Sequence, residues 1–294
     1  FDLILINWNT WSSFFTIKLI NIFKSKPIIY DAYTLIYEDY IDSDLNKNFL
    51  SNLLYKNIEK IIFCNCNALL TDTLSHKKKI LHLTKSKTKI LALNVAQKNF
   101  SLSKKINLND KIQLLHAGAN RKLHNINKMI YLVNNLPANL KKKIFFTIIG
   151  KDYFDKHKKL IRKLGCEKNI KLINHLKYDN YLKMVKKADV CLGLFGSSEK
   201  SQNIISNFIV TSINLGKVII TKNTRSAQIY LNNNEGIILL KKPERLNFTK
   251  FFRKFINSKK YRNNLKNKSK ITFLKHFKIE KNFKNLDLFI KNFF

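Results

Sequence analysis

Residues 112–125, IQLLHAGANRKLHN, contain the pattern that decides the fold of this chain. An apolar run ends at Gly118, a basic loop with Arg121, Lys122 and His124 follows, and a helical spacing of apolar residues then begins. Continuous apolar runs of this kind are typical of strands buried on both faces of a parallel sheet. At such a strand-to-helix turn, backbone N–H groups and cationic side chains can bind a diphosphate. A basic loop is also expected by chance in so lysine-rich a chain, so a phosphate site needs support from the rest of the sequence.

Alternating strand and helix patterns extend from this stretch in both directions. Apolar runs predict strands at 3–6, 27–30, 61–63, 68–70, 89–93, 112–116, 144–149, 170–173, 190–194, 218–221 and 236–239. Apolar residues three and four positions apart predict helices at 11–23, 49–58, 124–135, 153–164, 178–187, 203–215 and 224–232, and in the tail beyond residue 250. Strand–helix alternation with continuously apolar strands predicts an α/β fold whose parallel sheets are covered on both faces.

A Lys-, Asn- and Ser-rich stretch divides this alternation into two series. We therefore predict two Rossmann-like, doubly wound domains that face each other across a cleft and are joined by a linker at 99–111. The first domain is expected to span 1–98 and the second 112–270, and the helix at 271–294 is expected to cross back to the first. Phe1 lies inside an apolar strand pattern, so we expect the first domain to be incomplete at its start.

The net charge of +36 raises the question of a nucleic-acid partner. Lys supplies nearly all of the positive charge, whereas Arg is the usual residue for bidentate contacts to phosphates and bases. The Lys residues are spread along the chain beside abundant Asn and Ile, as AAA and AAT codons would place them at solvent positions. Nucleic acid is therefore not expected as a partner, while an anionic membrane surface would attract a Lys-rich face.

Cysteine and hydropathy patterns indicate the cellular compartment of the protein. Cys64 and Cys66 form a C-x-C pair without a second pair or histidines at zinc spacing, so no metal site is expected. The four cysteines are interpreted as small core residues in a reduced compartment. No run approaches the ~18 apolar residues of a membrane span, and no signal peptide is visible. These features predict a cytoplasmic protein that can lie peripherally at the inner face of the cell membrane.

Ligands of doubly wound folds bind beyond the carboxyl ends of the strands, which singles out the residues after each predicted strand. These residues are Asp31–Tyr33, Thr71–Thr73, Gly118–His124, Gly150–Asp152, Gly196–Lys200 and Thr221–Thr224. Although the chain has only seven Gly, those at 118, 150 and 196 lie at these strand ends, where the backbone needs either a close approach or a positive φ. One wall of the expected cleft would then hold an acceptor and the other a nucleotide.

At these positions the sequence resembles the group 1 (family 4) glycosyltransferases of the GT-B fold. Gly118 matches the Gly after the first strand of their C-terminal domain, and His124-Asn125 stands where Lys-Gly is usual. FTIIGKD at 146–152 is similar to their second strand, which ends in Gly. The segment GSSEKSQNIISNFIVTSINLGKVIIT at 196–221 is similar to a subgroup pattern in which a Lys and an Ile-Pro-Asn-Lys run precede a helix. KPIIYDAYTLIYED at 26–39 resembles their strand ending in Asp-Ala-His.

The resemblance implies transfer of a sugar from a nucleotide-diphosphate sugar to a glycan or lipid-linked acceptor, with retention of configuration and without a metal or another cofactor. It implies a donor site and an acceptor-side catalytic pair. The donor-site candidates are Gly118, Arg121, Lys122, His124, Gly150, Gly196, Ser197, Lys200, Asn207 and Thr211, and the catalytic candidates are Asp31 and Tyr33. Helix N-termini and cations would stabilise the leaving diphosphate.

The sequence departs from the family at acidic positions of the donor site. The two Glu that the family usually places eight residues apart are Asn203 and Thr211 here, and the His after Asp-Ala is Tyr33. Thr211 can hydrogen bond a ribose hydroxyl, but as a neutral and shorter group it would hold it more weakly. A non-catalytic GT-B scaffold or binding subunit with a degenerate donor site therefore stays open. A nucleotide-sugar epimerase shares the architecture, but Tyr33 and Thr211 do not supply the acid and base groups that it needs.

Several of these residues also have a purely structural interpretation. Asp31 could cap the next helix instead of contacting an acceptor, and Asn207 could be a local cap instead of a donor contact. Asp72 and Thr73 fit a helix N-cap better than a catalytic role, and His116 fits a core or rim residue of its strand.

Overall fold

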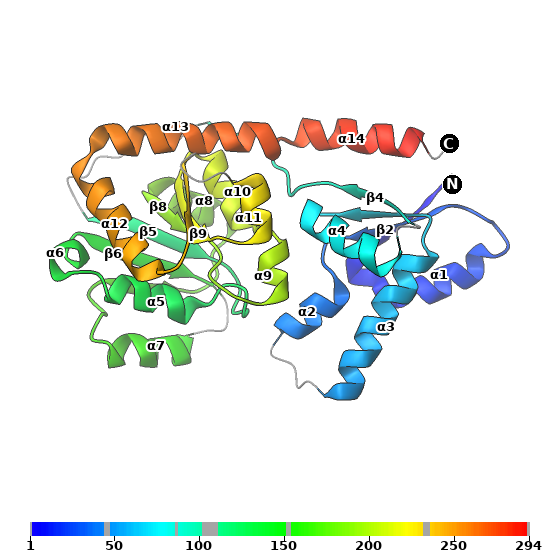
Figure 1. Ribbon diagram of the computed structural model, residues 1–294, viewed down its shortest axis with the longest axis horizontal. Helices are drawn as coiled ribbons and strands as arrows, with labels where there is room; N and C mark the ends of the chain where they lie inside the picture. The colour runs from blue at the N-terminus through cyan, green and yellow to red at the C-terminus, as the bar shows by residue number, and fades with distance from the viewer. Residues whose placement is uncertain are drawn as a thin grey trace. The chain divides into compact units, whose positions relative to one another are not determined.

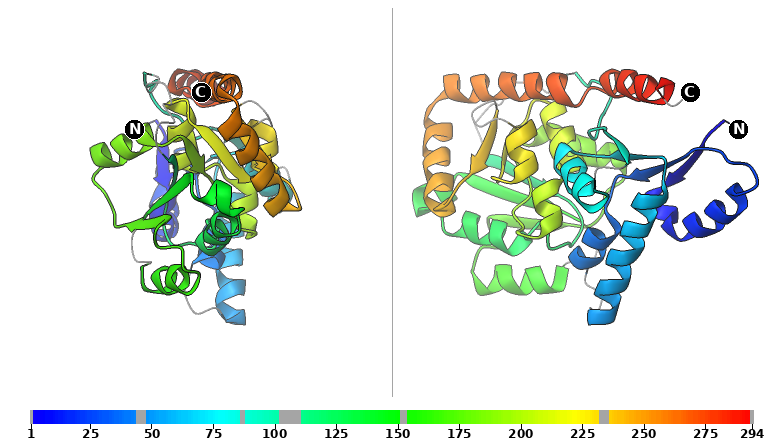
Figure 2. Two further views of the ribbon diagram at one scale, coloured as in Figure 1. Left: turned by 90° about the vertical axis from the view of Figure 1, so that its left-hand side faces the viewer. Right: turned by 45° about the vertical axis from the view of Figure 1, so that its right-hand side comes forward.

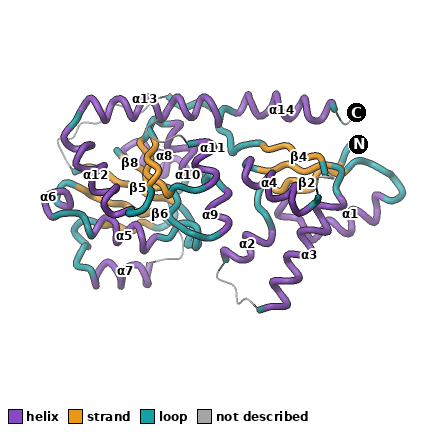
Figure 3. The backbone as a smooth tube through the Cα atoms, viewed as in Figure 1, coloured by secondary structure: helices purple, strands orange, loops and turns teal. Residues whose placement is uncertain are grey.

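The apolar runs form two parallel sheets in the computed structural model, which describes residues 2–43, 48–85, 88–101, 111–150, 154–231 and 236–292. The chain divides into unit 1, Phe1–Ala96 with Ile279–Phe294, and unit 2, Gln97–Lys278. In each unit the strands lie together with helices packed around them (Figures 1 and 3). The predicted α/β class with two parallel sheets is therefore confirmed. The linker predicted at 99–111 falls mostly outside the described residues, and the predicted domain boundaries stay predictions.

Unit 2 contains a six-stranded parallel sheet in the order β10-β9-β8-β5-β6-β7. Its strands are β5 (Ile112–Ala117), β6 (Ile144–Ile149), β7 (Ile170–Ile173), β8 (Val190–Leu192), β9 (Val218–Lys222) and β10 (Ile237–Leu240). Successive strands run outward on one side from β5 to β7 and on the other side from β8 to β10. The direction of winding reverses between β5 and β8, which pair directly through Leu114 and Val190. This reversal is the switch point at which doubly wound folds bind ligands.

The helices of unit 2 connect these strands and bury their faces. They are α5 (Ile126–Asn134), α6 (Ala138–Lys141), α7 (Phe154–Lys163), α8 (Tyr178–Lys187), α9 (Glu199–Asn203), α10 (Asn207–Asn214), α11 (Arg225–Tyr230), α12 (Glu244–Asn257) and α13 (Lys259–His276). Alternate residues of the strands, such as Leu114 and Phe146, form one core with Met129 of α5 and Phe252 of α12. Because this core comes from a single face of the sheet, it fixes where each strand ends relative to its neighbours.

Unit 1 contains a four-stranded parallel sheet in the order β1-β2-β3-β4. Its strands are β1 (Ile4–Asn7), β2 (Ile28–Ala32), β3 (Ala68–Thr71) and β4 (Lys89–Ala92). Its helices are η1 (Trp8–Ser13), α1 (Phe14–Asn21), α2 (Ile36–Asp42), α3 (Phe49–Asn65), α4 (Leu74–Leu83) and the C-terminal α14 (Ile279–Lys291). Helix α14 is tied to this unit by the Asn282 amide, which donates to the Asn94 carbonyl at 2.5 Å.

Some sequence-based predictions were wrong in detail. Residues 61–63 are not a strand but the end of α3, in which Ile62 and Phe63 are buried whereas Ile61 is exposed, as one helix face requires. The helix predicted at 203–215 is two helices, separated by residues 204–206. Cys64 is exposed, so only the other three cysteines are core residues.

Among the described residues, no His, Cys, Asp and Glu side chains are grouped as a metal site, and no helix combines the length and apolarity of a membrane span.

Cations bind the carboxyl ends of many helices. The ammonium groups of Lys18, Lys141, Lys217 and Lys270 donate to carbonyls in the last turn of α3, α5, α8 and α10, at 2.5–3.1 Å. Arg262 does the same for α12. Carbonyls at helix ends lack intrahelical partners and carry the negative end of the helix dipole. Burial lowers the pKa of Lys217 to about 8, which still leaves it mostly protonated at neutral pH.

Candidate functional site

The loops after β5 and β8 interlock at the switch point of unit 2. The Gly196 N–H donates to the Leu123 carbonyl at 2.9 Å, and the Phe195 N–H donates to the His124 carbonyl at 3.3 Å. A Cβ at position 196 would lie 2.4 Å from the backbone oxygen of Lys122 and 2.5 Å from that of Leu123. A side chain would therefore push these loops apart, and glycine brings two of the predicted donor segments together.

The imidazole of His124 fills the space above Gly118. A Cβ on that glycine would lie 2.3–2.8 Å from three ring atoms of His124. Burial is the main cause that holds the pKa of His124 well below 6.5, and His116, Lys200 and Arg121 lower it further. His124 is thus neutral at pH 7 and is not the cation that the basic loop predicted. Arg121 and Lys200 supply the positive charge around it.

His116 is a second neutral imidazole beside the first. The two rings pack edge to face with centroids 5.0 Å apart, and burial lowers the pKa of His116 to about 4. Its Nδ1 lies 2.7 Å from the Leu192 carbonyl. The Nε2 of His116 and the Nδ1 of His124 have no hydrogen-bond partner among the described residues. The interpretation of His116 as a core residue is confirmed, with one of its two ring nitrogens satisfied.

Helix α5 begins at Ile126, directly after this loop and its N-cap residue Asn125. The backbone of Asn125 is left-handed, with φ 49°, and its side-chain oxygen accepts from the Lys128 N–H at 3.2 Å as the N-cap of α5. Asn enters the left-handed region more readily than most residues, which explains why it can stand where the resemblance places Gly. The N-terminus of α5, with its partial positive charge, thereby lies at the carboxyl edge of the sheet.

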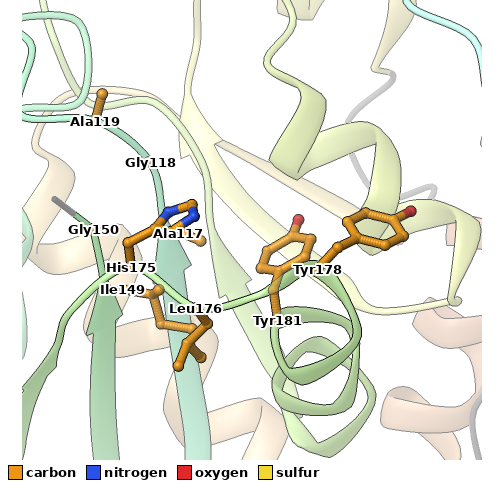
Figure 4. A pocket seen from close by; sticks show the side chains of 9 residues that line it. All are labelled: Ala117, Gly118, Ala119, Ile149, Gly150, His175, Leu176, Tyr178 and Tyr181. Carbon is orange, nitrogen blue, oxygen red and sulfur yellow. The ribbon is translucent and has the colours of Figure 1, made fainter.

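A pocket of about 360 Å³ opens at the carboxyl ends of β5, β6 and β7. It is lined by Ala117, Gly118, Ala119, Ile149, Gly150, His175, Leu176, Tyr178 and Tyr181 (Figure 4). The two tyrosines project from the first turn of α8 with ring centroids 6.1 Å apart. Glycine backbone on one side and aromatic rings on the other suit a flat ligand of moderate polarity.

The sequence of the chain matches the family described as Glycosyl transferases group 1 over residues 98–272. That stretch is more than half of the chain and contains the interlocked loops and the pocket. The protein is a group 1 glycosyltransferase. Among curated protein sequences, none matches the chain.

Solved structures of GT-B glycosyltransferases share the fold of this group 1 glycosyltransferase. Sucrose-phosphate synthase from Thermosynechococcus elongatus matches 100% of this chain and 74% of its own, with a TM-score of 0.78 and 10% identity. HepE from Anabaena matches 98% of this chain and 79% of its own, with a TM-score of 0.75 and 10% identity. TarM from S. aureus matches 98% of this chain and 54% of its own, with a TM-score of 0.77 and 14% identity. Identities this low establish the shared fold alone.

The two positions at which group 1 glycosyltransferases usually carry Glu are engaged by protein groups. The hydroxyl of Thr211 accepts from the Gln97 side chain at 2.8 Å. The amide of Asn203 donates to Glu199 at 3.3 Å. Thr211 is 3% exposed and Asn203 is 2% exposed. Thr211 is therefore not part of the pocket lining, and its hydroxyl is already bound within unit 2.

The remaining donor candidates lie in or near the loop after β8. Ser197 is exposed next to Gly196, and the following Ser198 caps α9, which carries Lys200. Asn207 is the exposed first residue of α10. The cap of α10 is the Ser206 side chain, so the alternative that Asn207 is the cap is wrong.

The sequence analysis missed several residues of this region. His175, Leu176, Tyr178 and Tyr181 follow β7, whose carboxyl end was not included among the post-strand segments. Lys222 lies in the predicted post-strand segment Thr221–Thr224 but was not named as a site residue; it ends β9 and donates to the Gly196 carbonyl at 3.0 Å. The rule that ligands bind at strand ends would have found the residues after β7 had it been applied to that strand as well.

The catalytic candidates Asp31 and Tyr33 lie at the carboxyl end of β2 in unit 1. Asp31 accepts from the Tyr33 N–H at 3.0 Å, and burial raises the pKa of its carboxyl group. The N-cap of α2 is Leu35, so the alternative that Asp31 caps this helix is wrong. Thr73 does cap α4, as expected, through a hydrogen bond from the His76 N–H at 3.2 Å.

A buried charge network that the sequence analysis did not find flanks this turn. His76 of α4 lies between two carboxylates, with its Nδ1 2.5 Å from Asp72 and its Nε2 2.9 Å from Glu38. Lys79 donates to the other oxygen of Glu38 at 2.6 Å. Glu59 of α3 lies nearby and accepts from the Tyr37 N–H at 2.9 Å. The network thus fastens α2, which follows the Asp31–Tyr33 turn, to α4 and to the end of β3.

Burial and the contacts within the network shift the pKa values of His76, Glu38 and Glu59. Burial alone would lower the pKa of His76, but Asp72 and Glu38 raise it to about 9, so the ring is an imidazolium at neutral pH. Burial would raise the pKa of Glu38, but His76 and Lys79 lower it to about 2. Burial raises the pKa of Glu59 to about 7. Buried charges of this kind persist only when each has a partner.

Proposed function

We propose that this group 1 glycosyltransferase transfers a sugar from a uridine-diphosphate sugar to a hydroxyl group of a glycan or lipid-linked acceptor. The observation that carries the proposal is the aromatic pocket beside the interlocked loops at the switch point. A protein of the same fold supports uridine as the nucleoside, because HepE from Anabaena has been solved with UDP and with UDP-glucose.

In this proposal the pocket takes the nucleobase, and Tyr178 and Tyr181 contact its face. The diphosphate lies over residues 118–124, where the N-terminus of α5, Arg121 and Lys200 supply positive potential. When the bond between the anomeric carbon and the phosphate oxygen breaks, its electron pair stays on the diphosphate. N–H groups and cations that are already in place stabilise this charge without reorganising. The neutral His124 contributes a ring N–H donor or acceptor and no charge.

The acceptor side of the proposal rests on Asp31 and Tyr33. The acceptor oxygen forms the new bond to the anomeric carbon, and its proton leaves to a base. A carboxylate whose pKa is raised by burial is a stronger base at neutral pH than an ordinary one, which favours Asp31 for this step. We infer that the configuration at the anomeric carbon is retained and that no metal takes part.

A second candidate function is a nucleotide-binding member without transfer activity. The neutral side chains at 203 and 211, both already engaged by protein groups, favour it. Such a protein would bind the nucleotide and leave the sugar in place.

Calorimetric titration with UDP, GDP, ADP and their glucose conjugates tests the donor site. We expect UDP and UDP-glucose to bind, and Tyr178→Ala to weaken UDP about tenfold, because aromatic–base stacking contributes about 1–3 kcal/mol. Tyr131→Ala is the matched control, since Tyr131 is an exposed tyrosine of α5 outside the pocket. Absence of binding by every nucleotide diphosphate would overturn the proposal. Binding without transfer to any glycan or lipid-linked hydroxyl, and without hydrolysis of the sugar, would establish the second candidate instead.

A further inference from the structure

Two buried imidazoles lie where the loops after β5 and β8 interlock. His116 of β5 is 1% exposed and His124 is 7% exposed. The Nε2 of His116 and the Nδ1 of His124 are buried, and neither has a hydrogen-bond partner in the part of the chain that the structure describes. Polar atoms buried in folded proteins are nearly always hydrogen bonded, so this pair of unpartnered nitrogens needs a physical reason.

The ionisable groups that act on His124 all oppose a positive charge on its ring. Burial does most to lower the pKa of His124, and three neighbours lower it further: His116 of β5, Lys200 of α9 and Arg121 of its own loop. The ring is therefore neutral at pH 7 when no donor is bound.

No carboxylate in the surroundings of the ring offsets these cations. In the described elements around the interlocked loops, which are β5, β8, β9, α5, α9 and α10, the single carboxylate is Glu199 of α9. It is bound by the Arg225 guanidinium. The remaining charged residues of these elements and of the loop after β5 are the cations Lys122, Lys128 and Lys222, and α10 has no ionisable side chain.

A charge on a buried imidazole is stable only beside an anion, and here that anion has to come from a ligand. The ring of His124 lies against Gly118, where a Cβ would be 2.3–2.8 Å from three of its atoms, and Gly118 lines the pocket of about 360 Å³. Helix α5 follows β5 and α9 follows β8, so both begin at the carboxyl ends of these parallel strands (Figure 2). An anion at the N-terminus of α5 lies beside His124, because His124 directly precedes the N-cap residue Asn125.

We propose that His124 takes up a proton when the diphosphate of the donor binds, and thereby becomes a third cation beside Arg121 and Lys200. Since the diphosphate belongs to the donor inferred above, this role of His124 rests on the proposed function. An opposite charge within about 4–6 Å favours the charged form of an ionisable group by about 1–3 pH units. Protonation of the ring therefore extends toward neutral pH only while the diphosphate is bound.

The proton follows the charge of the nucleotide through the reaction. Solvent supplies it when the donor binds. The departing diphosphate carries one more negative charge than the donor, so the charged ring is favoured further as the bond to the anomeric carbon breaks. The proton returns to solvent when the nucleotide leaves.

Calorimetric titration in buffers that differ in ionisation enthalpy counts the protons taken up with the ligand. UDP-glucose is the probe, because its diphosphate is esterified at both ends, whereas the terminal phosphate of UDP itself titrates at about pH 6. We expect the unchanged protein to take up protons with UDP-glucose, in a number that rises from about pH 7.5 to about pH 5.5. Over the same range the dissociation constant should fall by at most about tenfold for each pH unit, because at most one proton is bound with each ligand.

Two substitutions of His124 test the assignment of the proton. His124→Gln keeps a polar side chain that cannot be charged, and His124→Lys supplies a fixed charge. Both should bind UDP-glucose without proton uptake, and the lysine variant should bind it about tenfold more tightly than the glutamine variant. His175→Gln removes the imidazole that lines the pocket, and His82→Gln removes an exposed imidazole of α4; both should keep the proton uptake. Thermal midpoints without ligand show that each variant is folded.

Binding of UDP-glucose to the unchanged protein without proton uptake would overturn this role of His124 and leave the donor site in place, and this measurement needs no substitution. Uptake that persists in His124→Gln, or that is lost only in His175→Gln, would contradict it by assigning the proton to another group. Absence of binding by every nucleotide-diphosphate sugar would remove the proposed function, and the role of His124 with it.

Discussion

Replacing His76 by Gln should destabilise unit 1 and remove its stability loss at alkaline pH. The pKa of His76 is about 9 in the fold against 6.5 for an ordinary histidine. Since each pKa unit corresponds to about 1.4 kcal/mol, the imidazolium contributes about 3 kcal/mol to the free energy of unfolding. Because the pKa of the folded state is the higher one, this contribution is complete below pH 6.5 and is lost as the pH rises through 9. Gln cannot be charged, so the variant should lack both the contribution and the loss.

The two tryptophans make the measurement specific to unit 1. Trp8 and Trp11 both lie in η1, and Trp11 packs against Tyr55 of α3, so their fluorescence reports the unfolding of this unit by urea. The experiment compares the free energy of unfolding from about pH 6 to about pH 9.5. Glu59→Gln is the control. The pKa of Glu59 is raised to about 7, so the stability that its protonation contributes is lost between pH 4.5 and 7, below most of the pH range in which His76 titrates.

The unchanged protein and Glu59→Gln should both lose about 3 kcal/mol between pH 6.5 and 9.5, whereas His76→Gln should be nearly flat above pH 7.5. At pH 7 His76→Gln should already be less stable by about 3–5 kcal/mol, since Asp72 and Glu38 would then be buried without the charge between them. A slope above pH 7.5 that persists in His76→Gln would refute the assignment of this titration to the network.

Three further predictions concern unit 2. Gly196→Ala should weaken UDP binding at least tenfold in calorimetry, because its Cβ would lie 2.4 Å from the Lys122 carbonyl and separate the two loops. Asn125→Ala should lower the free energy of unfolding by about 1–2 kcal/mol, since Ala neither tolerates φ 49° nor caps α5. Asn125→Gly should change it by only a few tenths of a kcal/mol. A urea titration followed by circular dichroism measures both. Lys270→Met should lower the free energy of unfolding by about 1–3 kcal/mol, which a lower thermal midpoint would show. The reason is that the Asn214 carbonyl and side chain would lose the ammonium that binds them at 2.5 and 2.9 Å.

The strands of unit 2 were predictable because they are buried on both faces. β6 and β7 begin and end at the predicted residues. The prediction works here because a continuous apolar run is typical of a strand that helices cover on both faces of a parallel sheet. The run at 61–63 shows the limit of this reasoning. Three apolar residues fit either a strand or the end of a helix, and only the burial of Ile62 and Phe63 in the packed unit decides between them.

The strand-end positions of the donor-site candidates could be predicted from the sequence, but the state of their side chains could not. The sequence placed Gly118 and Gly196 at strand ends, where the structure shows their loops interlocked. It treated His124 as a cation, since the burial that makes the ring neutral depends on the contact with Gly118. The network around His76 joins residues 38 positions apart, and a spacing of that length has no local pattern from which to infer contact.

The lysines bound at the carboxyl ends of the helices show how this fold accommodates an excess of one charge. The chain has 19 acidic residues for 55 basic ones, so most cations cannot find a carboxylate. The carbonyls that end α3, α5, α8, α10 and α12 bind five of the cations that have no acid to pair with, and such carbonyls are present in any helix whatever its sequence. A chain whose codons drift toward lysine can therefore keep its architecture while its acids disappear. In such a lineage the lysines at 18, 141, 217 and 270 should change slowly, whereas those on open surface should be exchanged freely.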